Sequence, residues 1–218
     1  MISTIILDFD GVILESVSVK TEAFRELFSF EPDHVDEIVE FHKRNGGMSR
    51  FDKFRYIYSS ILYRDLTDDQ FRKLSDRFAD IVFKKILRTP FVPGAREFLD
   101  GSHRKLALYV VSATPEDELR QIIERRGLTR CFRGVYGAPG KKADHIKAIL
   151  SATHCGNENA VFIGDAINDL NAAKASGIRF IGRILPGEMN YFAGNPEVEH
   201  TISTLFELEK YIGPGTDT

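Results

Sequence analysis

The chain has 218 residues, of which 43% are apolar and 28% charged, and a formal net charge of −3; this composition is that of a globular protein with a sizeable core. The balance of charge argues against nucleic acid as the main partner, and no apolar run approaches the roughly 20 residues that span a bilayer. Cys131 and Cys155 lack metal-ligand spacing and are expected to be reduced thiols, and Asp8 and Asp10 exclude an N-terminal signal peptide, so we expect a cytoplasmic protein.

The first predicted element is a strand that ends in two acids. Residues 5–7 form an apolar run typical of a strand buried on both faces, and Asp8 and Asp10 follow it before a glycine. Burying a carboxylate without a partner is costly, and ligands bind at the carboxyl ends of strands in open α/β sheets. The two acids therefore indicate a metal site, an acid/base pair or a nucleophile. The alternative is a pair of aspartates that only caps the next helix.

Residues 15–88 show helical periodicity and no strand-like alternation. Thr67 and Gln70 are spaced as a capping box at the start of the last helix. The four apolar stripes contain Ala23, Leu27 and Phe30; Val35, Ile38, Val39 and His42; Phe51, Phe54, Tyr58, Ile61 and Leu62; and Phe71, Leu74, Phe78, Ile81 and Val82. Because four helices exceed a simple crossover between strands, we predict an all-α insert that forms a separate small bundle.

From residue 89 onwards, strand patterns alternate with helical ones. Four strands are predicted after the first, at residues 106–111, 134–137, 160–163 and 179–184. Thr114 is expected to cap the helix after the second of the five strands. Arg179 and Arg183 are expected at exposed positions of the fifth, and residues 213–218 are expected to be disordered. The six histidines show no ligand spacing and are expected to be structural or surface residues.

Polar side chains follow the predicted strands, where the carboxyl ends of a parallel sheet would bring them together. They are Asp8, Asp10, Ser112, Lys141, Lys142, Asp165 and Asp169. A hydroxyl, a cation and four carboxylates suit phosphoryl transfer, which needs a nucleophile, neutralisation of charge and an acid for the leaving group. Mg²⁺ prefers oxygen ligands, and a carboxylate can act as the nucleophile through an aspartyl-phosphate.

Four motifs together resemble those of the haloacid dehalogenase (HAD) superfamily, in the right order and over all of the α/β part. They are Asp8–Val12, Val110–Ser112, the lysine after Gly140 and Gly164–Asp169. The resemblance implies a Rossmann-like α/β core with a parallel five-stranded sheet at residues 1–14 and 89–218. It also implies that residues 15–88 are a helical cap domain of the type inserted after the first motif.

For the two acids of the first motif, the resemblance implies separate roles. Asp8 would attack phosphorus and become the aspartyl-phosphate. Asp10 would protonate the leaving alcohol and then activate water, while its backbone carbonyl binds Mg²⁺. Since this acid/base role requires a change of protonation, the pKa of Asp10 is expected to be raised relative to that of Asp8 by the neighbouring like charge.

The remaining motif residues would bind the phosphoryl group and the metal. Ser112 would hydrogen-bond the transferring group together with nearby backbone N–H groups, including that of Ala113, and the motif lysine would neutralise the nucleophile and the phosphate. Asp165 and Asp169 would complete the Mg²⁺ site with Asp8 and Asp10. Lys141 and Lys142 cannot both be the motif lysine, and the residues that follow favour Lys142.

Specificity is expected in the insert. The polar break at Asn45–Arg50 resembles cap loops that face the active site, and Arg50 and Lys53 are candidate substrate-binding residues for a polar or anionic leaving group. The alternative is a plain turn between helices with Ser49 as N-cap. Glu15 departs from the Asp that many family members carry at the cap entrance.

The predicted function is a Mg²⁺-dependent phosphatase for a small phosphorylated metabolite, such as a sugar phosphate or a phosphoglycolate-like monoester. A sugar-phosphate mutase of the same superfamily is the nearest enzyme alternative, since it shares every core residue. Dehalogenation and phosphonate hydrolysis are disfavoured because those branches lack the second aspartate, which is Asp10 here. A non-catalytic regulatory or binding module is the third possibility, although such a module needs no nucleophile.

Overall fold

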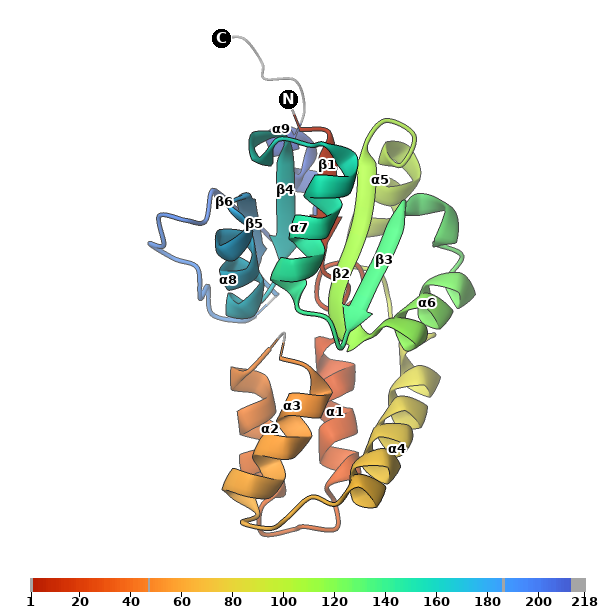
Figure 1. Cartoon of the computed structure of the whole chain (residues 1–218), viewed down its shortest axis with the longest axis vertical. Helices are drawn as coiled ribbons and strands as arrows, with labels where there is room; N and C mark the ends of the chain where they lie inside the picture. The colour runs from red at the N-terminus through yellow and green to blue at the C-terminus, as the bar shows by residue number, and fades with distance from the viewer. Residues whose placement is uncertain (1, 47, 186, 213–218) are drawn as a thin grey trace.

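The computed structural model describes residues 2–46, 48–185 and 187–212. Within them, a single sheet of six parallel strands has the order β3-β2-β1-β4-β5-β6 (Figure 1). The strands are β1 (Thr4–Leu7), β2 (Ala107–Pro115), β3 (Gly134–Ala138), β4 (Ala160–Gly164), β5 (Arg179–Arg183) and β6 (His200–Ile202). This order places β1 in the middle of the sheet, and the predicted Rossmann-like α/β core is confirmed.

The number of strands differs from the predicted five because β6 pairs with β5 at the edge of the sheet. This strand has three residues, of which only Ile202 is buried, so it is too short and too polar to show periodicity in the sequence. The predicted disorder of residues 213–218 lies outside the described residues.

Helices cover both faces of the sheet, because alternate side chains of each buried strand point to opposite sides. Ile5 and Leu7 of β1 belong to the apolar cluster that includes Leu119 and Ile122, whereas Ile6 belongs to the cluster on the other face, with side chains of α7 and α8. The covering helices are α5 (Ala95–Ser102), α6 (Glu116–Arg125) and α9 (Glu209–Ile212) on the first face, and α7 (Lys142–Thr153) and α8 (Ile167–Ser176) on the second. Short 3₁₀ turns lie at Thr129–Cys131, Asn157–Asn159 and Leu205–Glu207.

The segment between β1 and α5 forms a helical insert (residues 17–86) that lies beyond the carboxyl ends of the strands (Figure 1). Its helices are α1 (Val17–Leu27), α2 (Val35–Arg44), α3 (Arg50–Tyr56), a π-helix (Ile57–Ile61) and α4 (Asp68–Ile86). Phe24 packs against Phe54 and Phe78 with ring centroids 5.8 and 4.9 Å away. The capping box of Thr67 and Gln70 is confirmed. The division into a core and a separate cap domain stays a prediction.

The prediction that Arg183 is exposed is wrong, because its side chain is fully buried at the end of β5. Its guanidinium donates to both carboxylate oxygens of Glu15, at 2.9 and 2.6 Å, to the Gly11 carbonyl at 2.9 Å and to the Ser203 carbonyl at 3.2 Å. These acceptors make burial possible, since a buried cation needs a charged partner and hydrogen bonds. Arg183 thereby connects β5 to both the turn after β1 and the start of the insert.

We expect Arg183→Ala to lower the free energy of unfolding by about 3–5 kcal/mol, because it leaves the Glu15 carboxylate without its partner. Arg179→Ala is the matched control: Arg179 is on the same strand and pairs with Glu199, but both side chains are about one-third exposed. This change is expected to cost about 1 kcal/mol or less. Urea unfolding measures both, and equal losses in the two variants would contradict the anchoring role of Arg183.

Candidate active site

Asp8 stands at the carboxyl end of β1, in the middle of the sheet. Its backbone N–H donates to Ile163 of β4 at 2.9 Å, which continues the pairing of the two strands past Leu7. The side chain is buried, and its Oδ1 accepts from the Phe9 N–H at 2.7 Å. The central strand therefore fixes both the position and the orientation of this carboxylate.

Lys142 lies between two carboxylates. Its Nζ is 2.8 Å from Asp8 Oδ2 and 2.5 Å from Asp169 Oδ1, and all three side chains are buried. Lys142 is the first residue of α7, whereas Lys141 precedes the helix with an exposed side chain. Of the two lysines, Lys142 is thus the one that the fold places beside Asp8. The same two carboxylates raise its pKa despite burial.

Three carboxylates converge around this lysine. One oxygen from each of Asp8, Asp165 and Asp169 lies within 4.8 Å of the others. Burial raises the pKa of Asp8 to about 7 although Lys142 opposes the shift, and burial followed by the charges of Asp169 and Asp8 raises that of Asp165. Gly11, at φ +71°, admits this packing, since a Cβ there would lie 2.1 Å from Asp165 Oδ2. Clustered oxygen ligands that repel one another fit a hard divalent cation.

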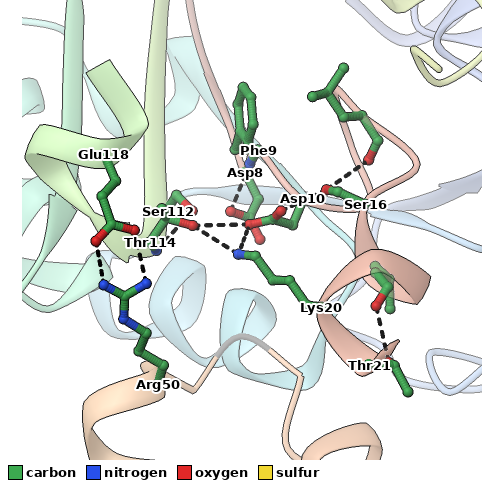
Figure 2. A network of polar contacts seen from close by, with 12 residues as sticks. Asp8, Phe9, Asp10, Ser16, Lys20, Thr21, Arg50, Ser112, Thr114 and Glu118 are labelled. Carbon is green, nitrogen blue, oxygen red and sulfur yellow. Dashed lines mark hydrogen bonds and ion pairs between the residues drawn. The ribbon is translucent and has the colours of Figure 1, made fainter. Parts of the chain in front are cut away.

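Asp10 is held apart from this cluster by its own partners (Figure 2). Oδ1 accepts from the Ser16 hydroxyl at 2.6 Å, and Oδ2 accepts from Lys20 and, at 3.1 Å, from the Thr114 hydroxyl. Burial would raise the pKa of Asp10, but Lys20 and the hydrogen bonds lower it below its ordinary value. The expected order of the two pKa values is therefore wrong: burial raises the pKa of Asp8, whereas Lys20 and the hydrogen bonds outweigh the effect of burial at Asp10.

β2 extends further than predicted, to Pro115, and carries Ser112 and Ala113 into the site. The buried Ser112 hydroxyl accepts from the Thr114 N–H at 3.2 Å. Thr114 does not cap α6, which begins at Glu116 and has Pro115 before it. Its hydroxyl is engaged by Lys20, at 2.8 Å, and by Asp10. Competition from these charged partners explains why the capping prediction is wrong.

A cavity of about 100 Å³ lies between the carboxyl edge of the sheet and the helical insert. The sheet side contributes Asp8, Asp10, Asp165 and the segment 112–115. The insert contributes residues of α1, α2, α3 and α4, and Gly46 lies close to the core, since a Cβ on it would lie 3.5 Å from the Ala166 Cβ. The lining residues of the insert include Lys20, Phe24, His42, Met48, Arg50 and Lys53.

Lys53 and His42 form a buried pair in the wall of this cavity. The Lys53 Nζ lies 2.9 Å from His42 Nδ1 and 5.6 Å from the centre of the Phe24 ring, and the residue is only 3% exposed. Burial and the nearby Lys20 lower the pKa of Lys53 to about 7. Burial and Lys53 lower that of His42 to about 2, so this histidine stays neutral.

Arg50 also lines the cavity, but a carboxylate already engages it. Both terminal nitrogens donate to Glu118 of α6, one of them at 2.8 Å, so that the pair links α3 of the insert to the core (Figure 2). Ser49 caps α3 through its hydroxyl, as the alternative interpretation of this loop expects. The structure thus combines the turn with an approach of Arg50 and Lys53 to the cavity.

Sequence reasoning missed Lys20, His42, Thr114 and Glu118. Lys20 and Glu118 have the pattern of solvated charges on amphipathic helices, and His42 completes an apolar stripe. A weak signal existed for Thr114, which follows Ser112 by two residues on an extended segment. The sequence held no signal for Lys20, His42 and Glu118. Their roles depend on contacts in the fold, with Asp10, Lys53 and Arg50 respectively, and local spacing does not encode such contacts.

In the part of the chain that the structure describes, none of the helices is long and apolar enough to cross a membrane.

Comparisons with known proteins agree with this geometry. The model of the haloacid dehalogenase-like hydrolase family matches residues 5–183. Phosphoglycolate phosphatase 1 of Pseudomonas aeruginosa is 24% identical over 184 residues, which are 80% of this chain and 66% of that protein. The chain spans 47–66% of the length of this and two further curated relatives, both phosphoglycolate phosphatases of Pseudomonas fluorescens.

Solved structures share the fold at low sequence identity. CbbY from Rhodobacter sphaeroides, in complex with phosphate, has a TM-score of 0.74 and 19% identity, over 95% of this chain and 96% of that one. YfnB from Bacillus subtilis, bound to magnesium, has a TM-score of 0.73 and 15% identity, over 98% and 99%. At these identities the likeness shows a common fold.

The lowered pKa of Lys53 predicts a pH dependence of stability. Between pH 7 and 10.5 the unfolded chain holds a proton on Lys53 that the folded chain lacks, so unfolding takes up protons. The free energy of unfolding should then rise with pH, by up to about 1.4 kcal/mol per pH unit from this group. We expect Lys53→Met to remove the rise and Lys43→Met, at an exposed position, to keep it. Urea unfolding from pH 7 to about 10 measures this, and parallel curves for wild type and Lys53→Met would contradict it.

Proposed function

Because the chain belongs to the haloacid dehalogenase-like hydrolase family, we propose that it is a Mg²⁺-dependent phosphatase acting on a small phosphorylated metabolite. A sugar phosphate or a phosphoglycolate-like monoester is the substrate we propose, because the curated relative of this chain is named for phosphoglycolate hydrolysis. The observation that carries the proposal is the buried Lys142 ammonium between Asp8 and Asp169, at the carboxyl edge of the sheet. A lysine that neutralises a central buried carboxylate suits a nucleophile that must meet an anionic substrate.

In the proposed reaction, Asp8 attacks phosphorus, so that a bond forms between its carboxylate oxygen and phosphorus while the bond to the leaving oxygen breaks. Phe9 N–H and Lys142 orient the carboxylate from two sides. The charge of Lys142 favours the ionised form of Asp8 against the effect of burial. Ser112 and the backbone N–H of Ala113 would hydrogen-bond the transferring phosphoryl oxygens.

Asp8, Asp165 and the backbone carbonyl of Asp10 would hold Mg²⁺, with Asp169 in support. The donor set fits, since three carboxylates gather within 4.8 Å and repel one another. When bound, the cation would neutralise charge on the phosphoryl oxygens. Asp169 also accepts from Lys142 and from the Ala166 N–H at 3.1 Å, which fixes its orientation.

Asp10 would act as the acid and base. With Lys20 beside it, the ionised form of Asp10 is favoured, and this form takes a proton from the water that attacks the aspartyl-phosphate. The new bond from the water oxygen to phosphorus replaces the bond to Asp8, so that phosphate leaves and the Asp8 carboxylate is restored. Protonation of the leaving alcohol needs the protonated form, and hence a weaker contact with Lys20. Because Lys20 belongs to α1, the position of the helical insert would set the protonation of Asp10. We propose that the insert serves as a cap, with Lys53 and Arg50 facing the leaving group.

The first test is of covalent, metal-dependent hydrolysis. Purified protein should release free phosphate from members of a panel of phosphorylated metabolites, without any bisphosphate activator and in a manner that EDTA abolishes. Asp8→Asn should lose turnover because an amide is a poor nucleophile, and Asp165→Ala should require more Mg²⁺ because an oxygen ligand is lost. Asp144→Asn, an exposed acid in the first turn of α7, is the control that should keep activity. Activity that survives Asp8→Asn would refute the mechanism, and a need for a bisphosphate would identify a mutase.

The second test separates the two aspartates of the first motif. Asp10→Asn should reduce hydrolysis of alkyl esters by about 10²–10⁴-fold, since an alkoxide leaves poorly without a proton. The release of phenol in the first turnover of an aryl phosphate should fall much less, because a phenolate leaves without a proton, whereas the later release of phosphate needs Asp10 as base for both esters. Rapid-quench measurement of the two leaving groups gives the comparison. An equal loss for both would mean that Asp10 acts only through structure.

A further inference from the structure

Arg50, a cation in the wall of the cavity, is neutralised by the carboxylate of Glu118. Arg50 is almost fully buried, with an 8% exposed side chain, and both terminal nitrogens donate to the Glu118 carboxylate, which is 27% exposed. Its planar group also lies 5.4 Å from the centres of the Phe51 and Phe78 rings. A bidentate pair in such surroundings is strong, because little water competes for either partner.

The other cations that line the cavity are largely matched as well. Lys20 is paired with Asp10, and Lys43 with Glu40. Among the residues that the structure describes, Lys53 is the cavity-lining cation that has no carboxylate within ion-pair distance, and its partner is the neutral His42. With Lys142 shared between Asp8 and Asp169, the site therefore holds little positive charge beyond what the transferring phosphoryl group requires.

Arg50 retains one unused donor. Its Nε is buried and has no hydrogen-bond partner, a rare state for a buried N–H, since such a group costs free energy when it is left unpaired. A substrate oxygen would reach it only after a shift of the surrounding side chains, because the atom is closed to solvent. Because Glu118 already balances the charge of Arg50, this donor suits a neutral oxygen such as a hydroxyl or a carbonyl.

We propose that Glu118 is a specificity-determining residue, a built-in counter-anion that neutralises Arg50 and excludes substrates with a second phosphate group. The substrate class is then a monophosphate whose leaving group presents neutral oxygens to Arg50 and at most one anionic group to Lys53. This inference rests on the proposed function for the nature of the substrate, but its test does not depend on turnover.

The physical basis is like-charge repulsion in a confined space. A second phosphate beside Arg50 would either lie against the Glu118 carboxylate or displace it, and displacement would break both hydrogen bonds of the pair. Placing like charges together is one way in which proteins reject a wrong ligand. Removing the charge of Glu118 should therefore open the Arg50 end of the cavity to a second anion.

Binding of two matched, non-hydrolysable probes tests the proposal: propylphosphonate, and propane-1,3-bisphosphonate, which adds a second phosphonate. In Mg²⁺, calorimetry gives the ratio of the two Kd values for wild type, Glu118→Gln and Glu118→Ala. We expect both variants to shift this ratio by about tenfold or more in favour of the bisphosphonate. Glu124→Gln, an exposed acid on the same helix, is the matched control and should keep the wild-type ratio.

A double variant assigns the effect to the pair. Glu118→Gln combined with Arg50→Gln should return the ratio towards the wild-type value, because the cation that Glu118 released is then gone. The proposal is overturned if the ratio is the same in wild type and in both Glu118 variants, if neither probe binds Glu118→Gln, or if the double variant keeps the gain. If the wild-type protein released no phosphate from any substrate, the proposed function would be refuted. The ratio of the two Kd values could still be measured, because binding of these probes does not depend on turnover.

Discussion

The contact of Lys142 with Asp8 and Asp169 is the interaction on which the site depends. It joins the end of the central strand to the first turns of α7 and α8, which lie more than a hundred residues further along the chain. Without the ammonium, the buried acids at this edge would face one another uncompensated, and desolvation would favour their neutral forms. The contact limits the rise that burial causes in the pKa of Asp8, and it raises the pKa of Lys142 although burial acts to lower it.

The two parts of the cavity carry opposite charge. The sheet and its loops contribute the carboxylates, and the helical insert contributes Lys20, Arg50 and Lys53. Two of these cations, Lys20 and Arg50, contact acids of the core, Asp10 and Glu118, so the insert is attached to the core through the groups that would also act on a substrate. A shift of the insert would therefore change the electrostatics of the site and its accessibility together, which suits a reaction that requires both acid and base forms of one residue.

The sequence predicts the parts of the fold that arise from local pattern. The apolar run before Asp8, the strand and helix alternation after residue 89 and the helical stripes of the insert all have counterparts in the structure. The burial and contacts of side chains whose partners are distant in the sequence could not be predicted from it. Arg183 looks like an exposed strand residue until Glu15, 168 positions away, is placed beside it, and Lys20 and Glu118 look like solvated helix charges until the cavity is known. The Thr114 hydroxyl likewise hydrogen-bonds Lys20 and Asp10 and does not cap the next helix, as its local sequence would favour.

Arg183 links the core to the root of the insert through one side chain, which donates to Glu15 and to the Gly11 carbonyl. An exchange of the insert for that of another family member would therefore also change the surroundings of Arg183 in the core. A donor segment with a neutral residue at position 15 would leave a buried guanidinium with half of its acceptors, next to the turn that orients Asp10. Chimaeras of this core would thus require an acidic residue at position 15, just before the insert, and aspartate, one methylene shorter than glutamate, would draw the start of α1 closer to β5.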